Sequence, residues 1–443
     1  MKAIRGAALT FVDDPFRVGG EASAHYESDA LILIKDGRIQ AFGPYAAIKD
    51  SLPADAALTS YPNALILPGF IDTHVHYPQT QIIGSYGKQL IDWLNNYTFV
   101  AEQQFAQADH GRAVARVFLR ECMRAGTTTA MVYCTVYPQS VEVFFEEAEK
   151  TGARMIAGKV MMDRHAPAAL LDTAQSSYDQ SKTLLQKWHG RGRLLYAITP
   201  RFAATSSPAQ MEAAGALWKE FPSAYLQSHV SENLGEIAWV KALYPQRNGY
   251  LDVYDHYGQL GPRAVYGHGI HLSDAELARC HETGTAIAHC PTSNLFLGSG
   301  CLNLDKLKSA VRPVRVGMAT DLGAGTSFSP LQTLNEAYKV AHLSGNALSA
   351  WQAFYLITRG AAQALYLDHC IGSIAPGFEA DLVVLDLHST PLIDFRMGYC
   401  RSLEEALFIQ MTLGDDRATR ATYVAGELLY DRQRQPQFSG TWC

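Results

Sequence analysis

The chain has 443 residues, of which 48% are hydrophobic and 18% are charged, and its formal net charge is −6. This balance supports a large folded core and excludes a disordered chain. The sequence has no basic stripe with interleaved aromatic residues and no apolar run of roughly 18 residues, so we expect neither a nucleic-acid surface nor a membrane span.

The first 65 residues carry strand patterns. Asp13 and Asp14 interrupt the N-terminus before a long apolar segment develops, which argues against a secretory signal. In "ALILIKDGRIQAFG", two apolar runs flank Asp36 and Gly37, a pattern typical of a β-hairpin. Near the other end, "GSIAPGFEADLVVLDL" and "ATYVAGELLY" predict strand–turn–strand units. Because chain termini often lie close in space, we predict that residues 1–66 and 376–443 form one β module.

The middle of the chain, residues 67–375, alternates strand-like apolar runs with helical stretches. The eight runs are "ALILPGFIDTHVH", "TTTAMVYCTVY", "RMIAGKVMMD", "LLYAITPRF", "AYLQSHVSE", "AVYGHGIHLS", "AIAHCPTS" and "VRVGMATDLGAG". Eight β units with helices between them predict an α/β protein with a (β/α)8 barrel of the TIM type. A doubly wound sheet has the same alternation, but the count of eight and the polar residues at strand ends favour the barrel.

Some helix ends can be placed from the sequence. Ser273 and Glu276 form the pattern of a capping box, and Gly284 is a plausible stop for the same helix. Ser207, followed by proline and Gln210, predicts the start of an earlier helix.

Residues of metal-ligand type follow several of the predicted strands. The first barrel strand ends in "DTHVH", and because residues i and i+2 of a strand point to the same side, His74 and His76 face the same way. His229, His268 and Asp321 stand at the ends of strands five, six and eight. The C-terminal ends of the strands are where barrel enzymes place their chemistry. Neutral imidazoles with a carboxylate suit a divalent metal, so these residues predict a metal site at the barrel mouth.

The same pattern favours a single metal. A second metal in such barrels usually requires a carboxylated lysine at the end of strand four, and this strand carries Arg201 instead. We interpret Lys159, in strand three, as a structural residue. A metal with an open coordination position lowers the pKa of bound water towards ~7. Glu232, three residues beyond His229, is the best-placed residue to move protons at this mouth.

Several other residues are expected to have no direct role. His281 and Glu282 lack the H-E-x-x-H pattern of metalloproteases. His271 is expected outside the ligand set, and His289 and Cys290 are expected to pack in the loop after strand seven. The P-C-x-x-C segment of the cytidine deaminases is absent, which excludes that zinc deaminase fold.

Taken in order, "PGFIDTHVH", "SHVSE", "GHGIHL" and "TDLGAG" resemble the one-metal deaminase branch of the amidohydrolase superfamily. Further segments make the resemblance more particular, to the bacterial guanine deaminases, over nearly the whole chain. These segments are "LIDWLNNYTFVAEQQF", "HCPTSNLFLGSGCLNL", "DLGAGTSFSPLQTLNEAYKV" and "MTLGDDR". Two departures from the family pattern are Val100, where proline is expected, and Cys301, where an apolar residue is expected.

The resemblance implies an enzyme that hydrolyses guanine to xanthine and ammonia by attack of a metal-bound hydroxide on C2. Asp321 is expected to take the water proton, Glu232 to protonate ring N3, and His268 to polarise the site. Zinc is the implied metal, at one ion per chain, although iron(II) suits the same ligands. The implied ligands are His74, His76, His229, His268 and Asp321.

The resemblance also implies residues that bind the substrate. Gln79 lies in the loop after strand one, and its amide can donate and accept hydrogen bonds towards a purine edge. Arg201 ends strand four, and its guanidinium has the geometry to bind guanine O6 and N7. Phe202 is expected to pack on the base, and Trp93 and His229 are expected to complete the pocket.

The resemblance also implies that the terminal β module is a compact β-sandwich and that the protein is a homodimer.

The eight cysteines of the whole chain contain no C-x-x-C pair, which predicts free thiols in the reducing cytoplasm. Guanine is the expected small-molecule partner. Two alternatives stay open at this point. One is a related deaminase of another purine or triazine ring, such as an 8-oxoguanine or adenosine-type enzyme, and the other is a non-catalytic barrel that serves as an assembly protein.

Overall fold

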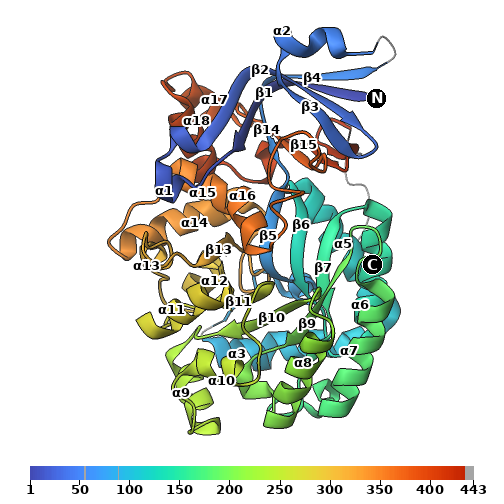
Figure 1. Cartoon of the computed structure of the whole chain (residues 1–443), viewed down its shortest axis with the longest axis vertical. Helices are drawn as coiled ribbons and strands as arrows, with labels where there is room; N and C mark the ends of the chain where they lie inside the picture. The colour runs from blue at the N-terminus through green and yellow to red at the C-terminus, as the bar shows by residue number, and fades with distance from the viewer. Residues whose placement is uncertain (54–55, 88, 435–443) are drawn as a thin grey trace.

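The computed structural model describes residues 1–53, 56–87 and 89–434. Its strands form two sheets, a nine-stranded sheet that curls into a barrel and a seven-stranded sheet built from both ends of the chain. Figure 1 shows the smaller sheet above the barrel, with blue N-terminal strands beside red C-terminal elements. The predicted α/β fold, a (β/α)8 barrel with a small β domain, is confirmed.

The main barrel strands run parallel and follow one another in chain order. Every position of β6, β7, β11 and β12 is buried, as expected for parallel strands that are covered on both faces. A short strand, β8 (Val160–Met161), also pairs with β9. The main strands are β5 (Phe70–His76), β6 (Thr127–Tyr133), β7 (Arg154–Gly158), β9 (Leu195–Pro200), β10 (Tyr225–Val230), β11 (Ala264–His268), β12 (Ala286–His289) and β13 (Arg315–Met318).

Side-chain and turn contacts bring β13 against β5 and close the barrel. Thr73 Oγ1 donates to the Met318 carbonyl at 3.0 Å, and the Asp321 amide donates to the His74 carbonyl at 3.0 Å. The close approach requires glycine at position 317, because a Cβ on Gly317 would meet the Thr73 side chain at 2.3 Å. Closure therefore places the ends of the first and last barrel strands at one mouth.

Helices cover the outside of the barrel, and shorter helical segments cover its mouth. The mouth segments after β5 are η3 (Tyr77–Ile82), α3 (Leu90–Trp93), η4 (Leu94–Thr98) and α4 (Phe99–Gln103). The other helices are α5 (Ala108–Arg124), α6 (Pro138–Thr151), α7 (Ala174–Trp188), α8 (Pro208–Glu220), α9 (Leu234–Leu243), α10 (Tyr250–His256), α11 (Asp274–Thr283), α12 (Pro291–Phe296), α13 (Leu304–Leu307), α14 (Pro330–Leu343), α15 (Ala350–Leu356) and α16 (Arg359–Ala364).

The helix ends expected from the sequence are confirmed. Ser273 and Glu276 form a reciprocal capping box at the start of α11, and Gly284 ends that helix in the left-handed conformation with φ +75°. Ser207 caps α8 by accepting a hydrogen bond from the Gln210 amide at 3.2 Å.

The β domain combines strands from both chain ends in the order β16-β15-β14-β4-β1-β2-β3. The expected hairpin between β2 and β3 turns at Asp36 and Gly37, whose φ angles are +51° and +76°. Its elements are β1 (Lys2–Phe11), α1 (Pro15–Val18), β2 (Ala24–Lys35), β3 (Arg38–Pro44), α2 (Tyr45–Ile48), β4 (Ala57–Pro68), β14 (Leu382–Asp386), α17 (Pro391–Met397), α18 (Leu403–Leu413), β15 (Thr419–Val424) and β16 (Glu427–Asp431).

The two halves of this sheet fold towards each other. The hydroxyl groups of Tyr61 in β4 and Tyr423 in β15 lie 2.6 Å apart, and Lys2 Nζ donates to the Gly426 carbonyl at 3.0 Å. A Cβ on Gly426 would meet Ile34 of β2 at 2.6 Å. Strands that are distant in the sheet order thus enclose a small core of their own, as in a sandwich.

The expected start of the first barrel strand is wrong. Residues 64–68 complete β4 in the β domain, and β5 begins at Phe70. The chain changes sheets at Gly69, where a Cβ would meet Thr128 Oγ1 at 2.2 Å. One apolar stretch, interrupted only by Pro68 and Gly69, therefore supplies two strands of different sheets. The domain limits expected at 66/67 and 375/376 stay a prediction.

The first strand expected in "GSIAPGFEADLVVLDL" is also wrong. The opening residues of this segment form a loop, and the strand begins only at Leu382. Gly372 has a φ angle of +82°, which a β-strand does not adopt, and Gly377, at +87°, lies in a turn with Pro376.

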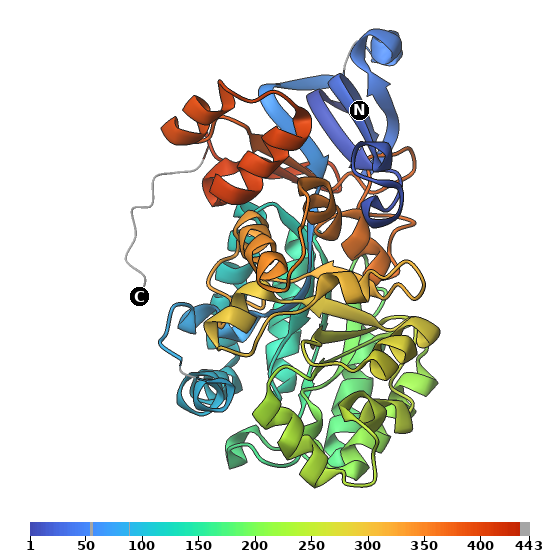
Figure 2. The same ribbon diagram turned by 90° about the vertical axis from the view of Figure 1, so that its left-hand side faces the viewer.

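Buried ion pairs join the barrel to the β domain. Arg154 Nε and Arg193 Nε contact Glu379 Oε2 at 3.2 and 2.9 Å, and Arg193 also pairs with Asp381 next to β14. Breaking a buried pair leaves an uncompensated charge, so these contacts hold the two parts in one arrangement. Figure 2 shows the two parts stacked in the same way from a second direction. Within the described ranges, no helix is both long enough and apolar enough to cross a membrane.

Candidate active site

Five side chains of ligand type converge at the barrel mouth. His74 and His76 come from β5, His229 from β10, His268 from the last position of β11, and Asp321 from the turn after β13. His74 Nε2 and His76 Nε2 lie 3.4 and 3.5 Å from Asp321 Oδ1. His76 Nε2 lies 3.1 Å from His229 Nε2, and His268 Nε2 lies 3.8 Å from Asp321 Oδ2. The structure thus brings together all five ligands predicted from the sequence.

The spacing of these atoms fits a metal ion. Ligand atoms about 2.0–2.2 Å from one metal are separated from each other by roughly 2.8–3.6 Å, which matches most of the distances. The Nε2 atom of His74 is buried and has no hydrogen-bond partner among the described residues. A buried polar atom without a partner is costly unless something coordinates it. The donor set therefore suits a divalent cation.

The protonation states of three of the four imidazoles and of the carboxylate also suit a cation. Burial lowers the pKa of His74, and burial together with the neighbouring imidazoles holds the pKa of His76 and His229 well below the usual value. His268 differs: burial alone would lower its pKa, but Glu232 and Asp321 raise it. Burial alone would raise the pKa of Asp321, but His74 and the other imidazoles lower it to about 2. Neutral imidazoles and an ionised carboxylate are the forms that bind a divalent metal.

Hydrogen bonds to the far side of two rings set their orientation. His229 Nδ1 donates to the Arg201 carbonyl at 2.6 Å, which leaves its Nε2 facing the cluster. His268 Nδ1 donates to Asn294 Oδ1 at 2.8 Å, with the same consequence for its Nε2. Such outer contacts fix the tautomer and the ring orientation of a metal-binding histidine.

The backbone around the ligands is held in uncommon conformations. His268 and Asp321 have φ angles of +72° and +46°, which are unusual for residues other than glycine. The Asp72 carboxylate accepts hydrogen bonds from the amides of Thr320 at 3.1 Å and His74 at 3.2 Å. Asp72 therefore connects β5 to the turn that carries Asp321, and its hydrogen bond to the Thr320 amide stabilises that strained turn.

Glu232 lies beside the cluster without joining it. Its Oε2 is 3.4 Å from His268 Nε2, and its Oε1 accepts a hydrogen bond from Ser299 Oγ at 3.2 Å. Its amide donates to Glu236 Oε2 at 2.9 Å. Burial raises the pKa of Glu232 to about 7, with the opposing effect of His268 and smaller contributions from Glu236 and Asp321. A carboxyl group in this range can both give and take a proton near neutral pH.

A cavity opens directly over the cluster. It contains all five residues predicted to bind substrate, His229 among them; the other four, Gln79, Trp93, Arg201 and Phe202, are 1–4% exposed. Phe202 and Trp93 also belong to the main hydrophobic core, so each side chain both lines the cavity and packs in the core. The lining residues are His76, Gln79, Leu90, Trp93, Leu94, Arg201, Phe202, His229, Glu232, Glu236, His268, Leu297, Asp321 and Ala324.

The residues expected to have no direct role lie outside the cluster, with one exception. His271 Nε2 contacts the Ser299 carbonyl at 3.0 Å, and Lys159 forms a buried ion pair with Asp172. The exception is Cys290, whose Sγ lies within 4.8 Å of ligand atoms of the cluster. Burial holds the pKa of the Cys290 thiol well above its usual value, and the thiol donates to the Ala288 carbonyl at 3.4 Å. A neutral thiol is a poor metal ligand.

Sequence reasoning missed several polar residues that support the site. Glu102 binds Arg201, Glu236 binds the Glu232 amide, and Asn294 and Ser299 bind His268 and Glu232. Asn294 and Ser299 both belong to "CPTSNLFLGSG", part of a segment that carries the resemblance. The sequence did not predict which residues of the site they contact. Glu102 likewise belongs to a quoted segment, "LIDWLNNYTFVAEQQF", but its contact with Arg201 was not expected.

Replacing Gly267 with alanine is expected to weaken metal binding at least about tenfold, as loss of an outer contact typically does. A Cβ on Gly267 would meet His74 Cε1 at 2.5 Å and push the ring out of place. Metal content after dialysis measures the effect. Gly43→Ala is the control, because a Cβ on Gly43 meets no atom within 4 Å. Unchanged metal affinity in Gly267→Ala would contradict the placement of His74.

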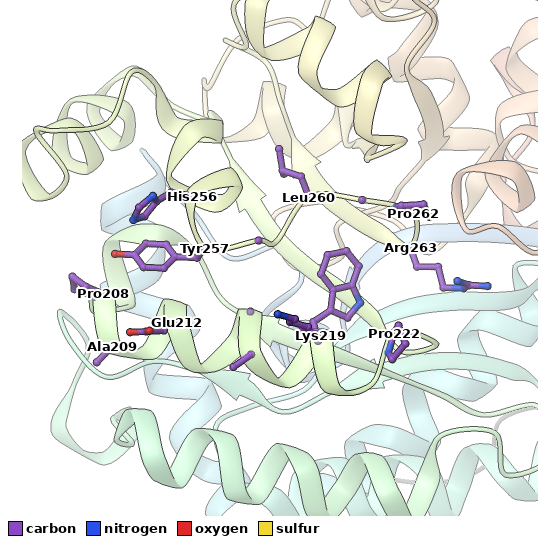
Figure 3. A pocket seen from close by; sticks show the side chains of 15 residues that line it. Pro208, Ala209, Glu212, Lys219, Pro222, His256, Tyr257, Leu260, Pro262 and Arg263 are labelled. Atoms are coloured by element: carbon purple, nitrogen blue, oxygen red, sulfur yellow. The ribbon is translucent and has the colours of Figure 1, made fainter.

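A second hollow, of about 990 Å³, lies on the outside of the barrel. Figure 3 shows it between α8, which carries Glu212 and Lys219, and the segment with His256, Tyr257 and Arg263. None of the groupings of metal-ligand residues found among the described residues lies here. The mouth cavity, though smaller, is therefore the candidate active site.

Comparison with known proteins shows which family the chain belongs to. Guanine deaminase of Escherichia coli (strain K12) is 50% identical to this chain over 435 residues, which cover 98% of both proteins. The structure of E. coli guanine deaminase matches 98% of this chain and 100% of its own with a TM-score of 0.95. Guanine deaminase from C. acetobutylicum with bound guanine in the active site is 27% identical and has a TM-score of 0.86, over 97% of this chain and 100% of that one. Residues 65–429 match the model of the amidohydrolase family, and the chain belongs to that family.

Proposed function

We propose that this protein is a metal-dependent hydrolase that converts guanine and water to xanthine and ammonia. The observation that carries the proposal is that the Arg201 side chain lines the same cavity as four of the five predicted metal ligands. A guanidinium offers only donors, and guanine presents acceptors at O6 and N7. Full-length similarity to guanine deaminases supports the same substrate.

The metal is proposed to be one zinc ion per chain, although iron(II) suits the same donors. His74, His76, His229, His268 and Asp321 would hold it. When bound, the metal supplies an activated water at neutral pH.

The protein's own residues bind the substrate and move its protons. Gln79 and Arg201 hold the purine by its polar edges, with Phe202 and Trp93 as apolar walls and His229 at the base of the pocket. The bound ring then presents C2 and its amino group to the cluster. Enclosure by these largely buried side chains excludes bulk water from the reacting carbon.

Glu232 is proposed as the group that protonates ring N3. It then delivers to the departing amine the proton that Asp321 took from the attacking water, and it regains its own proton from the hydroxyl group on C2 as the carbonyl forms. Its place beside His268, in the cavity but outside the ligand set, supports this role. Asp321 accepts the proton that leaves the attacking water, and His268 polarises the reacting centre. The products are xanthine and ammonia, and the carboxyl groups return to their starting states.

A panel of purines, with ammonia release as the measurement, tests the substrate. Guanine is expected to react, whereas adenine is expected to be turned over at least tenfold more slowly. Adenine has no amino group at C2, and its six-amino donor would face the donors of Arg201, an unpaired contact that costs about 1–3 kcal/mol. Faster turnover of adenosine or a triazine than of guanine would favour the alternative deaminases. Absence of all turnover by the metal-loaded protein would favour the assembly protein.

We also propose that the protein is a cytoplasmic homodimer, and that residues 1–66 and 376–443 form the β domain around a 67–375 barrel. The seven cysteines in the described ranges are free thiols, which supports a reducing compartment. The resemblance to guanine deaminases supports the dimer.

A further inference from the structure

A buried carboxylate behind the pocket holds the side chain of Arg201. Both oxygens of Glu102 accept hydrogen bonds from the same nitrogen, Arg201 Nη1, each at 2.8 Å. The exposed fractions of the two side chains are 3% for Arg201 and 0% for Glu102. Among the described residues, Nε and Nη2 of Arg201 have no hydrogen-bond partner. An arginine–carboxylate pair usually uses two guanidinium nitrogens, so this pair leaves more donors free than usual.

We propose that Glu102 is a positioning residue for substrate recognition: by holding Nη1 of Arg201, it directs the remaining N–H groups towards the oxygen-bearing edge of the purine. The inference rests on the proposed function, because it names how that pocket selects a six-oxo purine. Glu102 does not line the cavity itself, so it acts through Arg201.

The helix that carries Glu102 supports Arg201 on two sides. Phe99 and Glu102 are three residues apart in α4 and lie on the same helix face. The Arg201 guanidinium lies over the Phe99 ring, with 5.6 Å from its central carbon to the ring centroid. α4 is tied to the segment that carries Gln79, because Gln81 Nε2 donates to the Ala101 carbonyl at 3.2 Å.

Glu102 also compensates the positive charge of the buried Arg201. Arg201 is buried and lines the same cavity as His76 and Asp321 of the cluster, so its charge lies close to the metal site. A divalent cation at the cluster would repel an uncompensated guanidinium towards solvent. The carboxylate of Glu102 neutralises Arg201 from the side away from the cavity, so the guanidinium can stay beside the metal site.

Glu102→Gln, made in the full-length metal-loaded protein, tests the inference with two substrates. Guanine and 2,6-diaminopurine both carry the amino group at C2, but the latter has a donor where guanine has O6. Glu102→Gln is expected to raise the KM for guanine by about 10- to 100-fold, with kcat and metal content changed less than about threefold. The preference in kcat/KM for guanine over 2,6-diaminopurine should fall at least about tenfold.

A double-substitution cycle separates positioning from a general structural effect. In an Arg201→Met protein, adding Glu102→Gln should change the guanine KM less than about twofold, because Glu102 acts on the substrate only through Arg201, which is already replaced. The inference would be overturned if the effects of Arg201→Met and Glu102→Gln on the guanine KM multiplied in the double variant. It would also be overturned if Glu102→Gln lowered kcat and left KM unchanged. Glu147→Gln is the matched control: Glu147 is also mostly buried and pairs with Arg112 at 2.9 Å, but it lies between α5 and α6. It should leave the substrate preference unchanged.

Two further comparisons cover a variant that does not fold and a failure of the proposed function. If Glu102→Gln alone does not fold, Arg201→Met and Arg201→Met/Glu102→Leu are compared, because the double variant leaves neither partner buried and charged. Equal guanine kinetics in these two proteins supports the inference, and a further loss in the double variant overturns it. The wild-type protein separates this inference from the proposed function. Failure of wild type to release ammonia from guanine refutes the function, whereas normal wild-type turnover with an unchanged KM in Glu102→Gln refutes only the role of Glu102.

Discussion

Replacing Glu232 with glutamine is expected to lower kcat for guanine by about 10²–10⁴-fold, the usual contribution of a general acid–base group. Glutamine keeps the shape of the side chain and can still accept the hydrogen bond from Ser299, but it cannot carry the proton to N3. Metal content and guanine affinity should stay close to wild type, because Glu232 is 3.4 Å from His268 and is not one of the five ligands. Steady-state kinetics, guanine binding and metal analysis together measure the effect.

The control for Glu232→Gln is Glu282→Gln, which changes an exposed carboxylate on α11 that pairs only with Arg279 in the described structure. It should keep full activity. A near-normal kcat in Glu232→Gln would show that another group carries the proton. Loss of metal in that variant would show instead that Glu232 helps to form the metal site.

The metal cluster was predictable because its signal is local. Each ligand stands within the last three residues of a strand or within three residues after it, and parallel strands in a barrel bring their C-terminal ends to one mouth. Counting strands and noting the residue at each end was therefore enough to join His74 with Asp321, which are far apart in sequence. Helix ends such as Ser273 and Gly284 were equally local, since capping depends on neighbours within one turn.

The parts that sequence reasoning missed depend on contacts across the fold. Glu102 lies on a short helix and meets Arg201 only because α4 folds back over the barrel mouth. Glu236 resembles an ordinary helix-capping residue, and its second role beside Glu232 needs the packed site. The boundary at Gly69 was missed although Pro68-Gly69 is a local turn signal, because the apolar residues on both sides resemble one strand. The close approach to Thr128 shows why glycine is needed there.

The protein is expected to contain one metal ion per active chain and to lose nearly all activity without it. The five predicted ligands fall in two groups of close ligand atoms that share His74, and the position just after β9 holds Arg201 rather than a lysine that could bridge a second ion. A metal of this kind contributes several kcal/mol to the reaction, or about 10³-fold or more in rate. Removal with a chelator should abolish ammonia release, and zinc should restore it. His74→Ala should lower both metal content and activity by a comparable factor.

Metal should also stabilise the fold, because it binds the native cluster and not the dispersed ligands of the unfolded chain. Tm should therefore rise with added zinc in wild type and much less in His74→Ala. His281→Ala is the control, since His281 lies on α11 away from the cluster and contacts the Pro313 carbonyl at 2.8 Å. Two metal ions per active chain, or an active His74→Ala protein without metal, would contradict the single-site assignment. In the first case a ligand set beyond the five residues would be required, and in the second the attacking water would have to be activated by Glu232 or Asp321 alone.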